Sequence, residues 1–215
     1  MVYFSEITLA AIVRNELDNP AGGIISFVDS LLPFLGAGVI VDTGSTDGTR
    51  ETLDEMTRKY PHLKIYDHRF KGFADARNIS LSHVGTEYAL VLDADERIKL
   101  EGLERLRIIL DTTYYPGHHF PWIPVFPNFT ERKTYKYQPH NPRLFSPTST
   151  TVYTDITGLG EELHWVEPLN GYKTNIPIYH YLHSDAETCA KDAWYRRVEE
   201  HIATHQSTFL PHWKT

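Results

Sequence analysis

The 215-residue sequence predicts an α/β fold in which helices cover both faces of a mostly parallel central sheet. Two observations lead to this prediction. Short apolar runs alternate with segments of helical periodicity through the first hundred residues, which is the pattern of strand–helix units joined in a parallel sheet. After Thr113 the pattern changes to short aromatic stretches interrupted by prolines, which indicates a small antiparallel extension at the C-terminal end.

Four apolar runs in the first half have the length of buried strands, and segments of helical periodicity lie between and after them. Asn19-Pro20 marks the entry to the first helix. Asp47 is a candidate N-cap of the second helix, which Pro61 then stops. The expected strands are residues 7–13, 38–41, 63–66 and 88–92, and the expected helices are residues 24–35, 47–60, 75–83 and 102–110.

The second half is rich in aromatic residues and is divided by prolines. Its short aromatic stretches predict strands at residues 122–126, 134–137 and 143–145. Residues 146–151 contain only serine, threonine and proline, without an apolar period, and are expected to form a mobile loop. A late helix is expected over residues 185–207.

Composition narrows the class of protein. A net charge of −7 argues against a protein that coats a nucleic acid polymer, because neutralising phosphates requires a basic surface. Cys189 is the only cysteine, which excludes an intramolecular disulfide and fits a reducing compartment. We find no positively charged leader and no apolar run long enough for a transmembrane segment. We therefore expect one cytoplasmic domain spanning residues 1–215, without a membrane span.

The fourth expected strand runs directly into Asp93-Ala94-Asp95. Carboxylates at the end of a core strand are costly unless their charge is offset. A divalent cation such as Mn2+ or Mg2+ provides that offset, because such ions prefer carboxylate oxygens and often keep a bound phosphate. The pair Asp93 and Asp95 is therefore a candidate metal site.

Three other segments place polar residues near the same sheet edge, where open α/β sheets bind ligands. Arg14-Asn15-Glu16 follows the first strand, and the segment from Asp42 to Thr49 follows the second. The latter contains two glycines and several hydroxyl groups, so its backbone can approach a ligand closely. Arg77 offers a planar guanidinium that can pair with a base or a phosphate. Together with the aspartates, these segments indicate a nucleotide site.

In this order the motifs resemble family 2 glycosyltransferases of the GT-A fold. The similar segments are Ile12 to Glu16, Val41 to Thr49, Ala74 to Asn78 and Val91 to Glu96. Two looser matches follow, one from Asn141 to Phe145 and one from Ile178 to Tyr181. The resemblance also suggests one domain of a longer polypeptide, with neighbouring domains as partners. It implies that residues 1–100 bind the nucleotide and that residues 101–215 bind the acceptor and complete the metal site.

The resemblance implies a role for each matching residue. Asp42 would bind the uracil or the ribose, and Arg77 would meet the base or the diphosphate. Asp93 would touch the ribose or the metal, and Asp95 would ligate the metal. His180 is the first choice for a further metal ligand, with His164 and His183 as runners-up. The remaining residues of the implied nucleotide pocket are Val13, Arg14, Glu16, Gly44 and Ala94.

The predicted reaction is metal-dependent, inverting transfer of a sugar from a nucleoside-diphosphate donor to a hydroxyl acceptor. The family favours UDP-sugars as donors, and the acceptor is expected to be a glycan. One carboxylate must take the acceptor's proton. Glu162 is the first candidate, followed by Glu161 and Asp155. Family members often carry Gly-x-x-His-Glu here, whereas this sequence has Gly158-Leu159-Gly160-Glu161-Glu162, with glutamate in the histidine position.

Two other functions remain open on the sequence alone. A nucleotidyltransferase shares a parallel sheet and metal-binding carboxylates, but normally has a glycine-rich phosphate loop after the first strand, where Arg14-Asn15-Glu16 lacks glycine. A non-catalytic nucleotide-sugar-binding module is the second alternative. Individual residues also have structural readings: Asp42 can cap a turn, and His180 can be an ordinary strand histidine.

Overall fold

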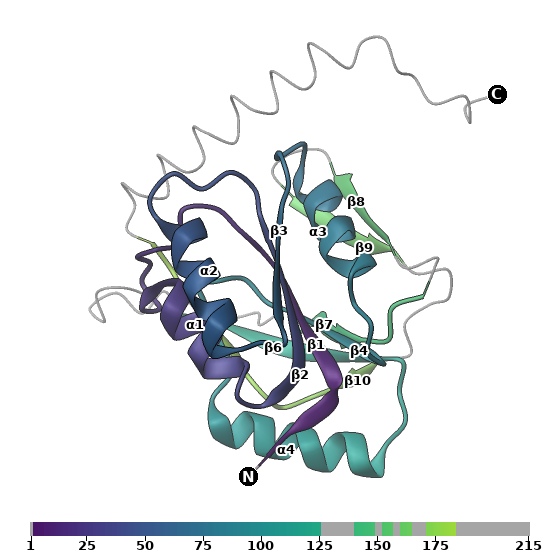
Figure 1. Cartoon of the computed structure of the whole chain (residues 1–215). Helices are drawn as coiled ribbons and strands as arrows, with labels where there is room; N and C mark the ends of the chain where they lie inside the picture. Colours follow the sequence, from purple (N-terminus) through teal and green to yellow (C-terminus); the bar gives the residue numbers. More distant parts are fainter. Residues whose placement is uncertain (1, 126–139, 149–151, 157–159, 165–170, 184–215) are drawn as a thin grey trace, which may run out of the picture.

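The centre of the computed structural model is a sheet that contains nine of the described strands (Figure 1). The structure describes residues 2–125, 140–148, 152–156, 160–164 and 171–183. The strand order across the sheet is β3-β2-β1-β4-β7-β6-β11-β5, and β10 pairs with β6. A separate two-stranded sheet is formed by β8 (Val152–Ile156) and β9 (Gly160–His164).

The first four strands of the order are parallel. β1 (Phe4–Val13) lies between β2 (Leu35–Asp42) and β4 (Tyr88–Val91), and β3 (Leu63–Asp67) pairs with the outer side of β2. Their carboxyl ends therefore lie at one edge of the sheet, which is the edge where the sequence predicts a nucleotide site. The parallel strands expected in the first half are confirmed.

Helices cover both faces of this parallel half. Alternate residues of β1 point to opposite sides of the sheet, and apolar residues on both sides pack against helices. Leu9 and Ala11 belong to a core cluster shared with α1, α2 and α4. Ala10 and Ile12 contact residues of α3 on the other face. Figure 1 shows α3 on the opposite side of the sheet from α1 and α2. The helices are α1 (Gly23–Leu31), α2 (Thr49–Lys59), α3 (Phe73–Ser82) and α4 (Leu100–Thr112).

The C-terminal extension contains both strand directions. β7 (His140–Phe145) is antiparallel to β4 and to β6 (Gly117–Val125), as the sequence predicts. β11 (Ile178–Tyr181) is parallel to β6 and antiparallel to β5 (Glu96–Arg97), while β10 (Tyr172–Lys173) is parallel to β6. The expected strand at 134–137, the helix at 185–207 and loop residues 149–151 lie outside the described residues.

The first helix is shorter than the prediction of residues 24–35. α1 ends at Leu31, and Leu35 already begins β2. Leu32 keeps helical backbone angles as the C-cap, but the helix cannot continue through Pro33, because proline lacks the N–H group that would donate within the helix. Asp47 is not the N-cap of α2, as predicted, because Gly48 occupies that position; Asp47 lies one residue earlier, where its carboxylate accepts bonds from the N–H (3.0 Å) and hydroxyl (2.7 Å) of Thr49. Within the described ranges, no helix has the length and apolar composition needed to cross a bilayer.

His118 lies fully buried on β6 among aromatic rings, including those of Tyr88, Tyr115 and Tyr172. Among the described residues, neither of its ring nitrogens has a hydrogen-bond partner. Burial, with a smaller contribution from His119, lowers the pKa of His118 to about 4. The imidazole is therefore neutral in the folded protein at neutral pH.

This histidine is expected to make the protein less stable in acid. Between its folded pKa and the unfolded value near 6.5, the unfolded chain binds more protons, so stability falls as the pH is lowered. The expected loss from His118 is about 2 kcal/mol between pH 7 and pH 5. Urea unfolding at both pH values should show that His118→Phe reduces this difference by about that amount. An equal pH dependence in the variant would contradict the prediction.

Candidate active site

The parallel register brings the first and second predicted segments together. Val13, the last residue of β1, pairs with Asp42, the last residue of β2. The loop after Asp42 folds back on this edge, where the N–H (2.9 Å) and hydroxyl (3.0 Å) of Thr43 donate to the carbonyl of Val13. The Arg14 guanidinium donates to the carbonyl of Thr43 at 2.9 Å. Val13, Arg14 and Asp42 thus lie together, as the sequence predicts.

Asp42 has one oxygen that is used within the protein and one that has no partner among the described residues. Its Oδ1 accepts the backbone N–H groups of Gly44 and Ser45, both at 2.8 Å. Its Oδ2 is buried and unpaired within the described part of the chain. A buried unpaired acceptor is costly in a folded protein. This oxygen can therefore accept a hydrogen bond from a ligand.

Gly44 allows this turn to approach Arg14 closely. Its φ of 103° lies in the left-handed region, which side chains other than glycine rarely adopt. A Cβ atom at this position would lie 3.2 Å from Nη1 of Arg14. The prediction that Gly44 belongs to a close-approach loop therefore fits the backbone geometry.

The carboxylate of Asp93 is held by two arginines. Arg77, which is almost fully buried on α3, forms an ion pair with Oδ1 of Asp93. Nη1 of Arg143, on β7, lies 4.0 Å from Oδ2 of the same carboxylate. Burial opposes the ionisation of Asp93, but the positive charges of Arg77 and Arg143 outweigh it and lower its pKa. Asp93 is therefore an ionised group whose charge is balanced by protein side chains.

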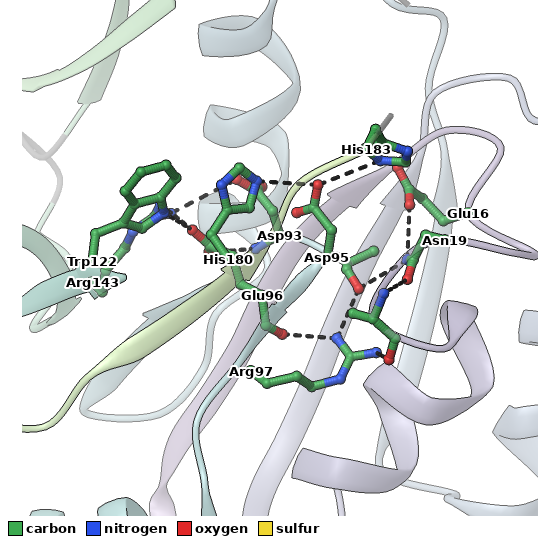
Figure 2. Close-up of polar contacts among 12 residues, drawn as sticks. Glu16, Asn19, Asp93, Asp95, Glu96, Arg97, Trp122, Arg143, His180 and His183 are labelled. Carbon is green, nitrogen blue, oxygen red and sulfur yellow. Dashed lines mark hydrogen bonds and ion pairs between the residues drawn. The ribbon is translucent and has the colours of Figure 1, made fainter. Parts of the chain in front are cut away.

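Asp95 points to a different set of partners, which come from β11 and the residues after it (Figure 2). Its Oδ2 lies 3.3 Å from Nε2 of His180 and 3.7 Å from Nε2 of His183. Pairing of β11 with β5 explains this meeting, since His180 pairs with Glu96 and Tyr181 N–H donates to the carbonyl of Asp95 at 2.9 Å. Burial opposes protonation of His180, but Asp95 outweighs it and raises the pKa of His180.

The chemistry of this group fits a divalent cation. One carboxylate and two imidazoles are suitable ligands for Mn2+. Two neighbouring ligands of an octahedral ion at about 2.1 Å lie about 3 Å apart, which is close to the separations seen here. As the side chains stand, no group of three histidine, cysteine, aspartate or glutamate residues in the described ranges is arranged to hold a metal. His180 and His183 would have to rotate about Asp95 to form such a group.

Hydrogen bonds from Asn19 and Arg97 hold the backbone carbonyl of Ala94, the residue between the two aspartates. The carbonyl of Ala94 accepts Nδ2 of Asn19 at 3.0 Å and Nη1 of Arg97 at 2.8 Å. Nδ2 of Asn19 also donates to Oε2 of the buried Glu16 at 3.0 Å. Burial lowers the pKa of Arg97 to about 10, although Tyr181, Asp95 and Glu16 oppose the shift. Glu16 and Ala94, both expected in the nucleotide pocket, thus belong to the hydrogen-bonded group that holds the segment from Asp93 to Asp95 in place.

Glu96 is a further residue of this region to which sequence reasoning assigned no role. Its side chain is 1% exposed and is surrounded by hydrogen-bond donors. Oε1 accepts Nη2 of Arg143 at 2.7 Å and Nε1 of Trp122 at 3.1 Å, and Oε2 accepts the N–H of Asp93 at 3.0 Å. Burial raises the pKa of Glu96, while Arg143 opposes the shift. The sequence feature that could have indicated a role for Glu96 is its position directly after Asp93-Ala94-Asp95.

The three candidate bases lie on the small β8–β9 sheet. Its backbone register pairs Asp155 with Glu161, and Thr154 with Glu162. This sheet is tied to α3, because the amide of Asn78 donates to the carbonyl of Tyr153 at 2.9 Å and accepts its N–H at 2.7 Å. The side chains of Asp155, Glu161, Glu162 and His164 lie outside the described residues.

Comparisons with known sequences place the chain in a family. The model described as "Glycosyl transferase family 2" matches residues 37–155. A cholesterol galactosyltransferase of Borreliella burgdorferi is 31% identical over 68 residues, which cover 32% of this chain and 19% of that protein. A teichoic acid poly(glycerol phosphate) polymerase of Staphylococcus epidermidis is 39% identical over 62 residues, which cover 28% and 9%. The chain therefore spans only a small part of these curated relatives.

Solved structures show similar but limited matches. S. aureus TarS in complex with UDP is 21% identical, with a TM-score of 0.49, and the match covers 61% of this chain and 40% of that one. The mannosyltransferase PcManGT from Pyrobaculum calidifontis, in complex with GDP-Man and Mn2+, is 22% identical, with a TM-score of 0.43. That match covers 54% of this chain and 35% of the mannosyltransferase.

The family match includes most of the site-bearing segments. It begins within β2, ends within β8, and so contains Asp42, Arg77 and Asp93-Ala94-Asp95. These segments are among those on which the sequence resemblance rests. Because the match covers more than half of the chain, the chain belongs to glycosyl transferase family 2 and has its GT-A fold.

Proposed function

We propose that this domain transfers a sugar from a UDP-sugar to a hydroxyl acceptor with the help of Mn2+ or Mg2+. The observation that carries the proposal is the joint placement of two groups at one sheet edge. Asp42 offers an unpaired buried acceptor at the end of β2, and Asp95 meets His180 and His183 after β4. The first suits a nucleobase, and the second suits the metal that accompanies a diphosphate.

The single available oxygen of Asp42 favours uracil over guanine. Oδ1 already accepts two backbone N–H groups, so within the described residues only Oδ2 is left for a ligand. Uracil presents one ring N–H, whereas guanine presents a ring N–H beside an amino group and is best matched by two acceptor oxygens. Arg14 and Gly44 lie beside Asp42 and would line the same pocket.

Asp95, His180 and His183 are the residues that would hold the metal. A bound divalent ion would stabilise the charge that develops on the departing diphosphate, as a Lewis acid. Asp93 is not required as a metal ligand, because Arg77 and Arg143 already balance its charge. We assign Asp93 and Arg77 to the ribose and diphosphate side of the pocket.

Catalysis also requires a base that takes the proton of the acceptor hydroxyl as the new bond forms. Glu162 is the proposed base, with Glu161 and Asp155 as alternatives, because the β8–β9 sheet is fixed to α3 at Asn78, the residue after Arg77. A single displacement by one acceptor inverts the anomeric carbon. The acceptor that we propose is a glycan.

We propose that residues 1–215 form one domain, in which residues 1–100 bind the nucleotide and residues 101–215 complete the metal and acceptor sites. The catalytic groups assigned above follow this division, since Asp42, Arg77, Asp93 and Asp95 precede residue 101 while His180 and Glu162 follow it. Neighbouring domains of a longer polypeptide are the proposed protein partners.

The proposal is tested by measuring ligand binding and donor turnover with the full chain. UDP, GDP and a panel of UDP-sugars are compared in thermal unfolding with and without Mn2+, since a ligand present at 100 times its Kd stabilises a protein by about 2.7 kcal/mol. UDP with Mn2+ is expected to stabilise the chain more than GDP does. Release of UDP from a UDP-sugar is then measured as hydrolysis. Absence of both stabilisation and hydrolysis would refute the proposal.

Asp42→Asn is expected to weaken UDP binding about 10-fold or more, even without metal. The asparagine oxygen can still accept the N–H groups of Gly44 and Ser45, but its amino group then replaces Oδ2. Two donors, the amino group and the uracil N–H, would face each other. Calorimetric titration with UDP measures the effect.

Asp67→Asn is the matched control for this substitution. Asp67 is the register neighbour of Asp42 on β3, but it forms an exposed ion pair with Arg50. We expect the affinity of Asp67→Asn for UDP to be unchanged. Equal affinities in all three proteins would remove Asp42 from the nucleotide site.

A further inference from the structure

Glu96 has a buried carboxylate for which stability alone provides a weak explanation. Its two oxygens accept three hydrogen bonds, from Arg143, Trp122 and the Asp93 N–H. Removing a carboxylate and a guanidinium from water is costly, and a buried ion pair often stabilises a fold no more than apolar residues would. The further contacts of its three partners therefore indicate the role of Glu96 better than its own stability contribution does.

Each partner of Glu96 also contacts a group of the candidate site. The N–H that Oε2 accepts belongs to Asp93 itself. Nη1 of Arg143 faces the Asp93 carboxylate at 4.0 Å, while Nη2 of the same guanidinium binds Glu96. The Trp122 ring packs against His180, with ring centroids 4.6 Å apart and an interplanar angle of 37°.

The backbone of Glu96 adds a fourth connection. It pairs with His180 across the β5–β11 ladder, next to the bond between Tyr181 N–H and the Asp95 carbonyl. Figure 2 shows Trp122, Arg143 and Glu96 together on the side of His180 away from His183. The side chain and backbone of one residue thus connect Asp93, Asp95 and His180.

From these contacts we infer that Glu96 is a positioning residue, which fixes the distance between the Asp95 carboxylate and the His180 imidazole and holds Asp93 in place. Glu96 acts through two partners: Trp122, which packs against the imidazole of His180, and Arg143, which faces the carboxylate of Asp93. Second-layer partners of this kind commonly change metal affinity about 10–100-fold when they are replaced. The inference rests on the proposed function, because it assigns Glu96 to the metal site proposed there.

Glu96→Gln tests the inference with little change in shape. A glutamine has one acceptor oxygen, so its amino group must face either the Asp93 N–H or the donors of Trp122 and Arg143. We expect the Kd for Mn2+ in the presence of UDP to rise about 10-fold or more, measured by the electron paramagnetic resonance of free Mn2+. We expect the metal-free affinity for UDP to fall far less than the Mn2+ affinity, since the Asp42 loop makes none of these contacts and only Asp93 on the ribose side is held by Glu96.

The matched control is Glu6→Gln, which breaks an ion pair with Arg107 between β1 and α4. It should leave both affinities unchanged. If Glu96→Gln does not fold by near-ultraviolet circular dichroism, Trp122→Phe takes its place, because it keeps an aromatic ring against His180 and removes the N–H donor to Glu96. That variant is expected to weaken Mn2+ binding several-fold, in the range of one lost hydrogen bond.

The outcomes separate the inference from the proposed function. If the natural chain binds Mn2+ and UDP, and the folded variant binds Mn2+ equally well, the positioning role is refuted while the proposed function stands. If metal-free UDP binding weakens as much as Mn2+ binding does, Glu96 has a general structural role and the inference is again refuted. If the natural chain binds neither ligand, both fail.

Discussion

Asp95→Asn is expected to lower the affinity for Mn2+ in the presence of UDP about 100-fold or more, which exceeds the usual effect of replacing a residue that only supports a ligand. Asp95 provides a carboxylate that lies between His180 and His183, at 3.3 and 3.7 Å. Asparagine keeps a carbonyl oxygen that His180 can bond, so the local structure can persist. What the substitution removes is the negative charge that a divalent cation requires.

Electron paramagnetic resonance of free Mn2+ monitors a Mn2+ titration in the presence of UDP. The Kd for UDP without metal is measured separately. Metal-free UDP affinity should change little, because Asp42, the proposed partner of the nucleobase, lies on a different strand. Asp29→Asn is a suitable control, since Asp29 forms an ion pair with Lys59 between α1 and α2. Unchanged Mn2+ affinity in Asp95→Asn would exclude Asp95 as a ligand and with it the proposed metal site.

Local sequence patterns are sufficient to predict which residues meet in the proposed nucleotide half of the site. Asp42 and Asp93 follow buried apolar runs, and parallel strands necessarily bring their carboxyl ends to one edge. The alternation of strands and helices therefore predicts both the fold class and the meeting of these residues. The predicted helix extends too far at residues 32–35 because apolar spacing alone does not register Pro33, which lacks the N–H group needed to continue a helix.

The second half of the site depends on pairing between distant residues, which local patterns do not specify. His180 meets Asp95 because β11 pairs with β5, a two-residue strand that no periodicity analysis can detect. A histidine in the position of His180 was expected from the family resemblance, and not from the residues alone. The burial of Glu96 likewise follows from contacts with Trp122 and Arg143, which come from two other strands.

Glu162→Gln is expected to lower donor turnover about 100-fold or more, within the range that a general base contributes, while UDP and Mn2+ affinities stay unchanged. An amide cannot take a proton from the attacking hydroxyl. The position of the β8–β9 sheet supports the assignment, because Asn78 holds Tyr153 by both its N–H and its carbonyl. The preceding residue, Arg77, binds Asp93, so one turn of α3 connects this sheet to the donor site.

Mn2+-dependent hydrolysis of a UDP-sugar provides the rate, with water in place of the unidentified acceptor. Glu161→Gln and Asp155→Asn are measured in parallel, because the register places these two residues opposite each other and one position away from the pair of Thr154 and Glu162. Glu104→Gln, at an exposed position of α4, is the control for loss of a carboxylate. If Glu162→Gln keeps the full rate while Glu161→Gln or Asp155→Asn loses it, the base is reassigned to that residue. If all three β8–β9 variants turn over donor normally, the β8–β9 sheet does not supply the base.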